Sequence, residues 1–147
     1  MNLKYMDLAF KEAEKAFKHR EVPVGAIIVK DGKVISKAYN KKEKTCCAIN
    51  HAEILAIKKA SKKLKNWRLE DCDIYITLEP CPMCASAIKQ ARIRNIYSAL
   101  SNKDNNTLIS EILKKDNTNS AVNIINELAV EKSETLLQKF FVIKRKK

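Results

Sequence analysis

The stretch Pro80-Cys81-Pro82-Met83-Cys84, together with His51-Ala52-Glu53 upstream, constrains this chain more than any other feature. Residues at i and i+3 share one face of a helix, so Cys81 and Cys84 can bind one ion. Pro82 suits the first position of a helix, and the positive end of that helix favours thiolates, the form that binds metal. With His51 as third ligand, one tetrahedral position stays open for water, as in catalytic zinc sites.

Glu53 follows the expected ligand His51 by two residues. Zinc lowers the pKa of a bound water from ~16 to ~7, and the released proton needs a carrier. We therefore expect Glu53 to be the catalytic acid and base. Either short motif alone is weak evidence, but the two together, in this order and with flanking prolines, form a specific pattern.

This pattern, H-x-E followed by P-C-x-x-C, is that of the zinc nucleobase deaminases. The sequence resembles the bacterial tRNA adenosine deaminase family over nearly its whole length, through Arg20–Ala26, Asn40 and Leu136–Phe141. The resemblance implies a three-layer α/β/α, cytidine-deaminase-like domain over residues 1–147, with a central mixed five-stranded sheet and one zinc ion. It also implies a homodimer that acts on the anticodon arm of tRNA and converts adenosine to inosine at the first anticodon position.

The resemblance further implies which residues contact the substrate. The edge from Val22 to Ala26 would border the pocket, and Asn40 would hydrogen-bond the ribose or the base. The full set of expected substrate-binding residues is Val22, Asn40, Ala52, Pro80, Lys103, Phe140 and Phe141. The segment 100–107 departs from the family, because only Lys103 remains of its Arg-Asp-x-Lys-Thr-Gly type loop. Cys46 and Cys47 stand where the family more often has an acidic and a small residue, and we interpret them as thiols that bind no metal.

Two other readings of the metal motif stay open. A free-base or mononucleotide deaminase, acting on guanine, cytosine or deoxycytidylate, would share the motif but has little need of a basic tail. An RNA-binding module with a structural zinc would need a fourth ligand, for which Cys46, Cys47, Cys72 and His19 are the only further Cys and His residues. Such a closed site would leave Glu53 without a role.

The composition bounds the cellular context. The net charge of +12 favours a polyanionic partner, such as the RNA that the resemblance implies. Five cysteines, an odd number, do not suggest a disulfide framework. The longest apolar run, from Val22 to Val29, is too short to span a bilayer, so we expect a cytoplasmic protein with no membrane partner.

Hydrophobic periodicity predicts helices alternating with strands. The expected helices are 3–19, 51–63, 82–90, 108–114 and 130–147, and the expected strands are 21–29, 34–39, 72–78, 93–99 and 122–126.

Asp31-Gly32 is a hairpin turn, and Asn50 is expected to cap the helix from His51. Gly25 indicates a close approach to the strand backbone. Trp67 is expected to be a packing anchor, Cys72 a core residue, His19 a surface residue and Lys144–Lys147 a phosphate-binding cluster.

Overall fold

The computed structural model describes residues 2–101, 106–114 and 122–145. Lys103 lies outside the described residues, and so do the side chains of the Lys144–Lys147 cluster. In chain order the elements are α1 (Leu3–Lys18), β1 (Gly25–Lys30), β2 (Lys33–Tyr39), α2 (Ala52–Leu64), β3 (Cys72–Ile76), α3 (Pro82–Gln90), β4 (Asn95–Ser98), α4 (Asn106–Leu113), β5 (Asn123–Ile125) and α5 (Val130–Arg145). The predicted alternation of helices and strands is therefore confirmed.

The five strands form one mixed sheet in the order β2-β1-β3-β4-β5. β1 is antiparallel to β2 and to β3, whereas β3, β4 and β5 are parallel. It follows that β2 runs in the same direction as β3. Because the carboxyl ends of β2, β3 and β4 meet at one edge of the sheet, side chains that follow these strands are brought together there.

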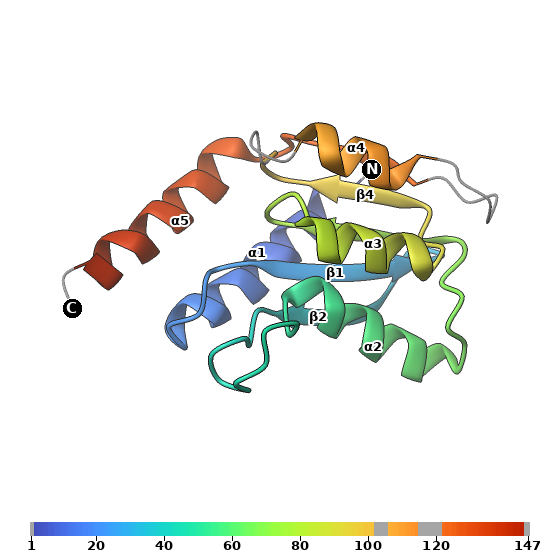
Figure 1. Cartoon of the computed structure of the whole chain (residues 1–147), viewed down its shortest axis with the longest axis horizontal. Coiled ribbons are helices and arrows are strands. Elements are labelled where there is room, and N and C mark those ends of the chain that lie inside the picture. The colour runs from blue at the N-terminus through green and yellow to red at the C-terminus, as the bar shows by residue number, and fades with distance from the viewer. Residues whose placement is uncertain (1, 102–105, 115–121, 146–147) are drawn as a thin grey trace.

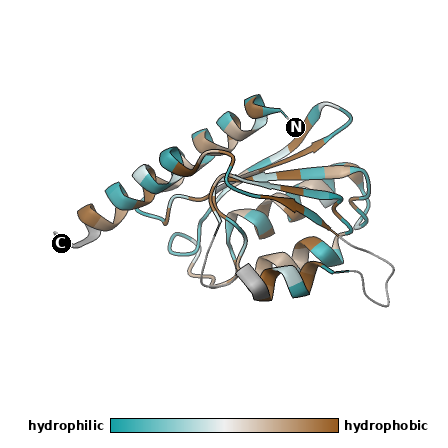
Figure 2. Cartoon of the chain, turned by 90° about the horizontal axis from the view of Figure 1, so that it is seen from above, coloured by the Kyte–Doolittle hydropathy of each residue, from teal (hydrophilic) through white to brown (hydrophobic). Residues whose placement is uncertain are grey.

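Helices cover both faces of the sheet and complete three layers (Figures 1 and 2). On one face α2, α3 and α4 bury a cluster that includes Ile74, Ile88 and Ile109. On the other face α1 packs against Ile27 and Tyr75, and Leu136 of α5 joins the same cluster. The α/β/α architecture is the one predicted. None of the helices in the described part of the chain is long and apolar enough to cross a membrane.

Gly25 allows α1 to lie directly against β1. A β-carbon at this position would lie 2.0 Å from the carbonyl oxygen of Ala9 and 2.6 Å from the amide nitrogen of Ala13. The close approach predicted at Gly25 is therefore confirmed, and the approaching group is the backbone of α1. Packing explains this glycine. The contact also holds α1 against β1, which begins at the edge of the sheet where β2, β3 and β4 end.

Two predictions about local structure are wrong. His51, and not Asn50, occupies the capping position of α2, because its backbone is already extended there; the Asn50 amide instead donates to the Thr45 hydroxyl at 2.8 Å. Trp67 is 56% exposed and does not anchor the core. It lies in the turn after α2, where its ring contacts the guanidinium groups of Arg68 and Arg92, while the fully buried Leu69 fills the core. Cys72 is buried and His19 is exposed, as predicted.

Candidate active site

Two helix N-termini meet at the carboxyl end of β3 and bring three metal-binding side chains together. His51 and Cys81 occupy the capping positions of α2 and α3, both with extended backbones. Neither side chain caps its own helix, so both are available to a shared centre. Pro82 begins α3, as predicted, and Cys84 lies one turn further along the same face.

The ligand atoms of His51, Cys81 and Cys84 all lie within 4.8 Å of one another. The Nδ1 atom of His51 is 3.7 Å from Cys81 Sγ and 3.5 Å from Cys84 Sγ. Zn–S bonds of about 2.3 Å and Zn–N bonds of about 2.0–2.1 Å, at a tetrahedral angle, place nitrogen and sulfur about 3.6 Å apart. Both nitrogen–sulfur distances therefore fit a tetrahedral zinc ion.

The two thiols hold their protons with different strength. The hydrogen bond between them lowers the pKa of Cys81 to about 5 and raises that of Cys84, whose burial acts in the same direction. Metal binding requires both as thiolates, so a bound divalent cation would release the proton of Cys84.

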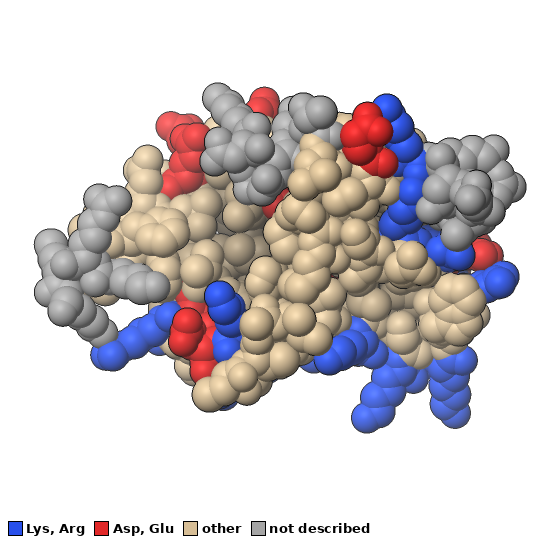
Figure 3. Space-filling model, viewed as in Figure 1, with Lys and Arg blue, Asp and Glu red and all other residues tan. Residues whose placement is uncertain are grey.

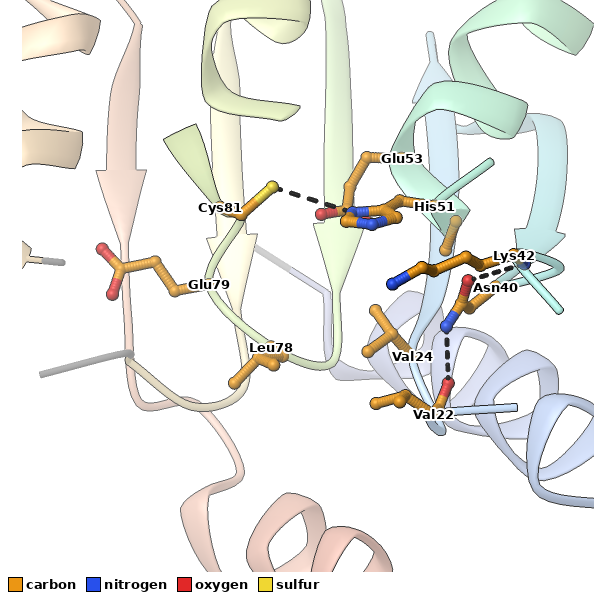
Figure 4. A pocket seen from close by; sticks show the side chains of 10 residues that line it. Val22, Val24, Asn40, Lys42, His51, Glu53, Leu78, Glu79 and Cys81 are labelled. Atoms are coloured by element: carbon orange, nitrogen blue, oxygen red, sulfur yellow. Dashed lines mark hydrogen bonds between the residues drawn. The ribbon is translucent and has the colours of Figure 1, made fainter. Parts of the chain in front are cut away.

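Glu53 lies in the first turn of α2, beside the three ligands but outside their group. Its side chain is only 4% exposed, and burial raises the pKa of its carboxyl to about 6. Figure 4 shows the carboxylate next to the His51 ring, on the wall of the pocket. A carboxyl with a pKa near neutrality can both accept and return a proton, as general acid and base catalysis requires.

The described part of the chain includes every Cys and His residue, and no fourth one joins the cluster. Cys46 is exposed in the β2–α2 loop, Cys72 is buried in β3, and His19 stacks on Tyr39 at the end of α1. A closed site with four Cys or His ligands is therefore not formed. The arrangement is that of a catalytic centre with three protein ligands.

A cavity of about 200 Å³ opens beside the ligands (Figure 4). It is lined by Val22, Val24, Asn40, Lys42, His51, Ala52, Glu53, Leu78, Glu79 and Cys81. The Asn40 amide nitrogen donates to the Val22 carbonyl at 3.3 Å, and its oxygen accepts from the Lys42 backbone at 3.1 Å. An Asn side chain has two donors and two acceptor lone pairs, so Asn40 keeps capacity for a ligand.

Pro80, Phe140 and Phe141, the remaining predicted substrate residues that the structure describes, do not line this cavity. Pro80 is buried next to the ligand Cys81. Phe140 is buried against Phe17 of α1, with ring centroids 6.4 Å apart, whereas Phe141 is 44% exposed. Their contact with substrate, and that of Lys103, stays a prediction.

Sequence reasoning missed three residues of the cavity wall, which are Lys42, Leu78 and Glu79. Val24 belongs to the edge from Val22 to Ala26 that is expected to border the pocket, and it lines the cavity. Lys42 stands two residues after the predicted contact Asn40, so alternation along an extended chain could have indicated it.

An α/β/α fold with one His, two Cys and a buried Glu beside a small cavity defines the class of the nucleobase deaminases. The family model of the MafB19-like deaminases matches residues 1–145, and the chain belongs to this family.

Three proteins within the deaminases are similar to this chain. The tRNA-specific adenosine deaminase of Aquifex aeolicus is 42% identical over 93% of this chain and 91% of its own length. A structure from studies of A-to-I editing by tRNA:A34 deaminases at the wobble position of transfer RNA matches with a TM-score of 0.83 and 35% identity, over 92% of this chain and 100% of that one. Guanine deaminase from Bacillus subtilis matches with a TM-score of 0.66 and 35% identity, over 74% of this chain and 70% of that one.

Proposed function

We propose that this protein is a zinc-dependent hydrolase that converts adenosine to inosine at the wobble position of tRNA. The juxtaposition of His51, Cys81 and Cys84 with the buried Glu53 carries the deaminase chemistry. The similarity to tRNA-specific adenosine deaminases, which extends over more than nine-tenths of both chains, supports the substrate. The whole chain, residues 1–147, would act as one deaminase domain.

His51, Cys81 and Cys84 would hold the zinc ion, which when bound supplies a Lewis acid that makes water a nucleophile at neutral pH. Glu53 accepts a proton from the attacking water and passes it to N1 of adenine, while the new C6–O bond forms. Glu53 then carries the second proton to the amino group, the C6–N bond breaks, and ammonia leaves. The products are inosine and ammonia, and Glu53 ends in its starting state.

The small cavity requires that the adenosine leave the stack of neighbouring bases. A stacked base hides C6, so the target must be splayed out of an RNA loop, as an anticodon loop permits. Val22, Val24 and Leu78 offer apolar surface to the base. The net charge of +12 supports an RNA partner, and Figure 3 shows lysine and arginine side chains projecting along the lower and right-hand edges of the visible face.

The homodimer rests on the resemblance to the family, and the proposed cytoplasmic location rests on the short apolar run from Val22 to Val29 and the odd number of cysteines. The exposed apolar residues Phe141, Val142 and Ile143 at the end of α5 are surface that a second subunit or the RNA could cover. Light scattering on the purified protein measures the subunit number, and a monomer at micromolar concentration would remove the dimer from the proposal.

The test is deamination of unmodified tRNA transcripts. The protein is incubated with transcripts that carry adenosine at the first anticodon position, and matched transcripts with guanosine there serve as controls. Inosine pairs as guanosine, so reverse transcription should report an A-to-G change at that position alone. Absence of any change with the zinc-loaded protein would refute the proposed substrate.

A free-base deaminase acting on guanine is the second candidate, favoured by the similarity to guanine deaminase from Bacillus subtilis. It shares the fold and the reaction type but has no need of a polyanion-binding surface. Release of ammonia from guanine, measured beside the tRNA assay, separates the two; cytosine and deoxycytidylate complete the set. Turnover of guanine without change in tRNA would favour this second candidate.

A further inference from the structure

Lys42 lines the cavity but takes no part in the proposed proton transfers. In Figure 4 its side chain runs from the β2–α2 loop into the cavity, and its ammonium ends between the His51 ring and Val24 in that view. It is the only Lys or Arg among the described residues that line the cavity. Within the described chain its ammonium forms no ion pair. Glu53 and Glu79 also line the cavity, but Lys42 forms no ion pair with either, so its ammonium can bind an anionic ligand.

A nucleotide offers this cation only one kind of anionic group. The base and the ribose are neutral, whereas the phosphate carries charge and is bound well by a lysine ammonium. We propose that Lys42 binds a phosphate group of the bound RNA strand, either of the nucleotide in the cavity or of its neighbour, and that the buried Glu21 positions the loop that presents Lys42. This proposal rests on the proposed function, because it assumes a nucleotide in the cavity.

Glu21 fixes the start of the β2–α2 loop. Its side chain is 1% exposed, and its two carboxylate oxygens accept the backbone N–H groups of Glu43 at 2.9 Å and Lys44 at 2.7 Å. Successive N–H groups at the start of a turn form a concavity that binds anions, and here the protein supplies the anion itself. The Glu21 backbone donates to the Ala16 carbonyl at 3.0 Å, so the loop is tied to the end of α1.

Asn40 fixes the same loop from the side of β2. Its oxygen accepts from the Lys42 backbone, and its amide nitrogen donates to the Val22 carbonyl. The backbone N–H groups of Lys42, Glu43 and Lys44 are thus all held by side chains. Lys42 and Lys44 are both exposed, but with the backbone held on both sides only Lys42 lines the cavity.

The first experiment compares Lys42→Met with Lys44→Met, which removes the same charge two residues further along. With an anticodon stem-loop RNA, Lys42→Met should raise KM about tenfold with little change in kcat. Because one phosphate contact to a single strand is lost, the slope of log(kcat/KM) against log[salt] should become less steep by about 0.7. Lys44→Met should change KM less than threefold. Equal effects of the two variants, or an unchanged KM in Lys42→Met, would overturn the proposal.

The source of the phosphate is distinguished by inhibition with product. If Lys42 contacts the phosphate of the deaminated nucleotide itself, inosine 5′-monophosphate should inhibit more strongly than inosine, and Lys42→Met should abolish the difference. If the two inhibit equally while the RNA effect of Lys42→Met is present, the phosphate belongs to a neighbouring nucleotide of the strand. Direct binding of both compounds can be measured even if the wild-type protein does not deaminate RNA, so a failure of the proposed function is recognised separately.

The second experiment tests the positioning role with Glu21→Gln, and Glu12→Gln is the matched control. Glu12 is also a buried glutamate, but it pairs with Lys15 on α1 and does not contact the loop. In Glu21→Gln the amide protons of Glu43 and Lys44 should exchange at least tenfold faster, KM for RNA should rise as in Lys42→Met, and zinc content should stay at one per chain. The double variant with Lys42→Met should show no further rise, because both act through one contact. Unchanged exchange, or loss of zinc or of cooperative unfolding in Glu21→Gln, would contradict a positioning role.

Discussion

Glu53 shows how position along a helix sets the chemistry of one residue. It lies in the first turn of α2, where a carboxylate is favoured by the helix N-terminus, yet burial raises the pKa of its carboxyl to about 6. The two influences oppose each other and leave the pKa of the Glu53 carboxyl close to neutral pH. This balance allows Glu53 to take up a proton and give it back within one catalytic cycle.

Replacement of Glu53 by Gln should separate metal binding from catalysis. The variant keeps His51, Cys81 and Cys84, so zinc content should remain near one per chain, while kcat falls by about 10²–10⁴ because the proton carrier is lost. Zinc is measured by atomic absorption and activity by inosine formation. Activity within threefold of the wild type would remove Glu53 from the mechanism.

Glu53 should also give the metal-free protein a characteristic pH dependence of stability. Below about pH 4.5 the carboxyl is protonated in both folded and unfolded states, so it has no effect. As the pH rises from 4.5 to about 6, the unfolded chain loses this proton while the folded one retains it, and stability falls by about 2 kcal/mol.

The measurement is urea unfolding of metal-free wild-type and Glu53→Gln protein at pH 4 and pH 7.5. The variant should gain about 2 kcal/mol relative to the wild type between the two pH values. An equal free-energy difference at both pH values would show that the folded pKa of Glu53 is ordinary.

At the scale of elements, α4 depends on a lysine from α3. Lys89 is buried and donates to the carbonyl oxygens of Ile112 and Lys114, at the C-terminal end of α4, where a cation is favoured. Replacement by Met leaves these carbonyls without this donor and should lower the free energy of unfolding by about 1–3 kcal/mol. Lys63→Met, at an exposed position of α2, is the control and should change it by less than about 0.5 kcal/mol. Equal thermal melts for the two variants would contradict this role.

The elements could be predicted from the sequence to the extent that their signals are local. The Pro82 start of α3 and the Asp31-Gly32 hairpin each follow from a few adjacent residues, and the structure has both. The exposure of Trp67 could not be predicted, because a large aromatic side chain in a turn can face either the core or the solvent. For Lys42 the sequence offers only its spacing from Asn40, because the hydrogen bonds that hold the next two backbone N–H groups of its loop come from Glu21, which is distant in sequence.

At the scale of the whole molecule, the fold joins these parts at one edge. β2, β3 and β4 end there, α2 and α3 begin there, and the loop from Asn40 to His51 closes the cavity. The order of the strands could not be derived from periodicity, because pairing depends on contacts between distant segments. The family resemblance implied a mixed five-stranded sheet but no strand order. The metal motif was readable because both of its parts are short and local.

The net charge of the molecule should make its activity depend on salt. If RNA is the substrate, kcat/KM should fall at least tenfold between 50 and 200 mM salt. Protein binding releases counterions from the RNA phosphates, and this release contributes less free energy at higher salt. Turnover of a neutral base such as guanine, if present, should change little over the same range. An RNA reaction insensitive to salt would contradict a polyanion-binding surface.

X-ray absorption at the zinc edge of the purified protein tests the central claim most directly, since it counts the atoms around the metal. We predict one zinc per chain with two sulfur neighbours at about 2.3 Å and two nitrogen or oxygen neighbours at about 2.0–2.1 Å, one from His51 and one from solvent. A third sulfur neighbour would mean that another cysteine closes the site, and a protein that binds no zinc would lack the centre altogether. Either result would contradict the deaminase mechanism.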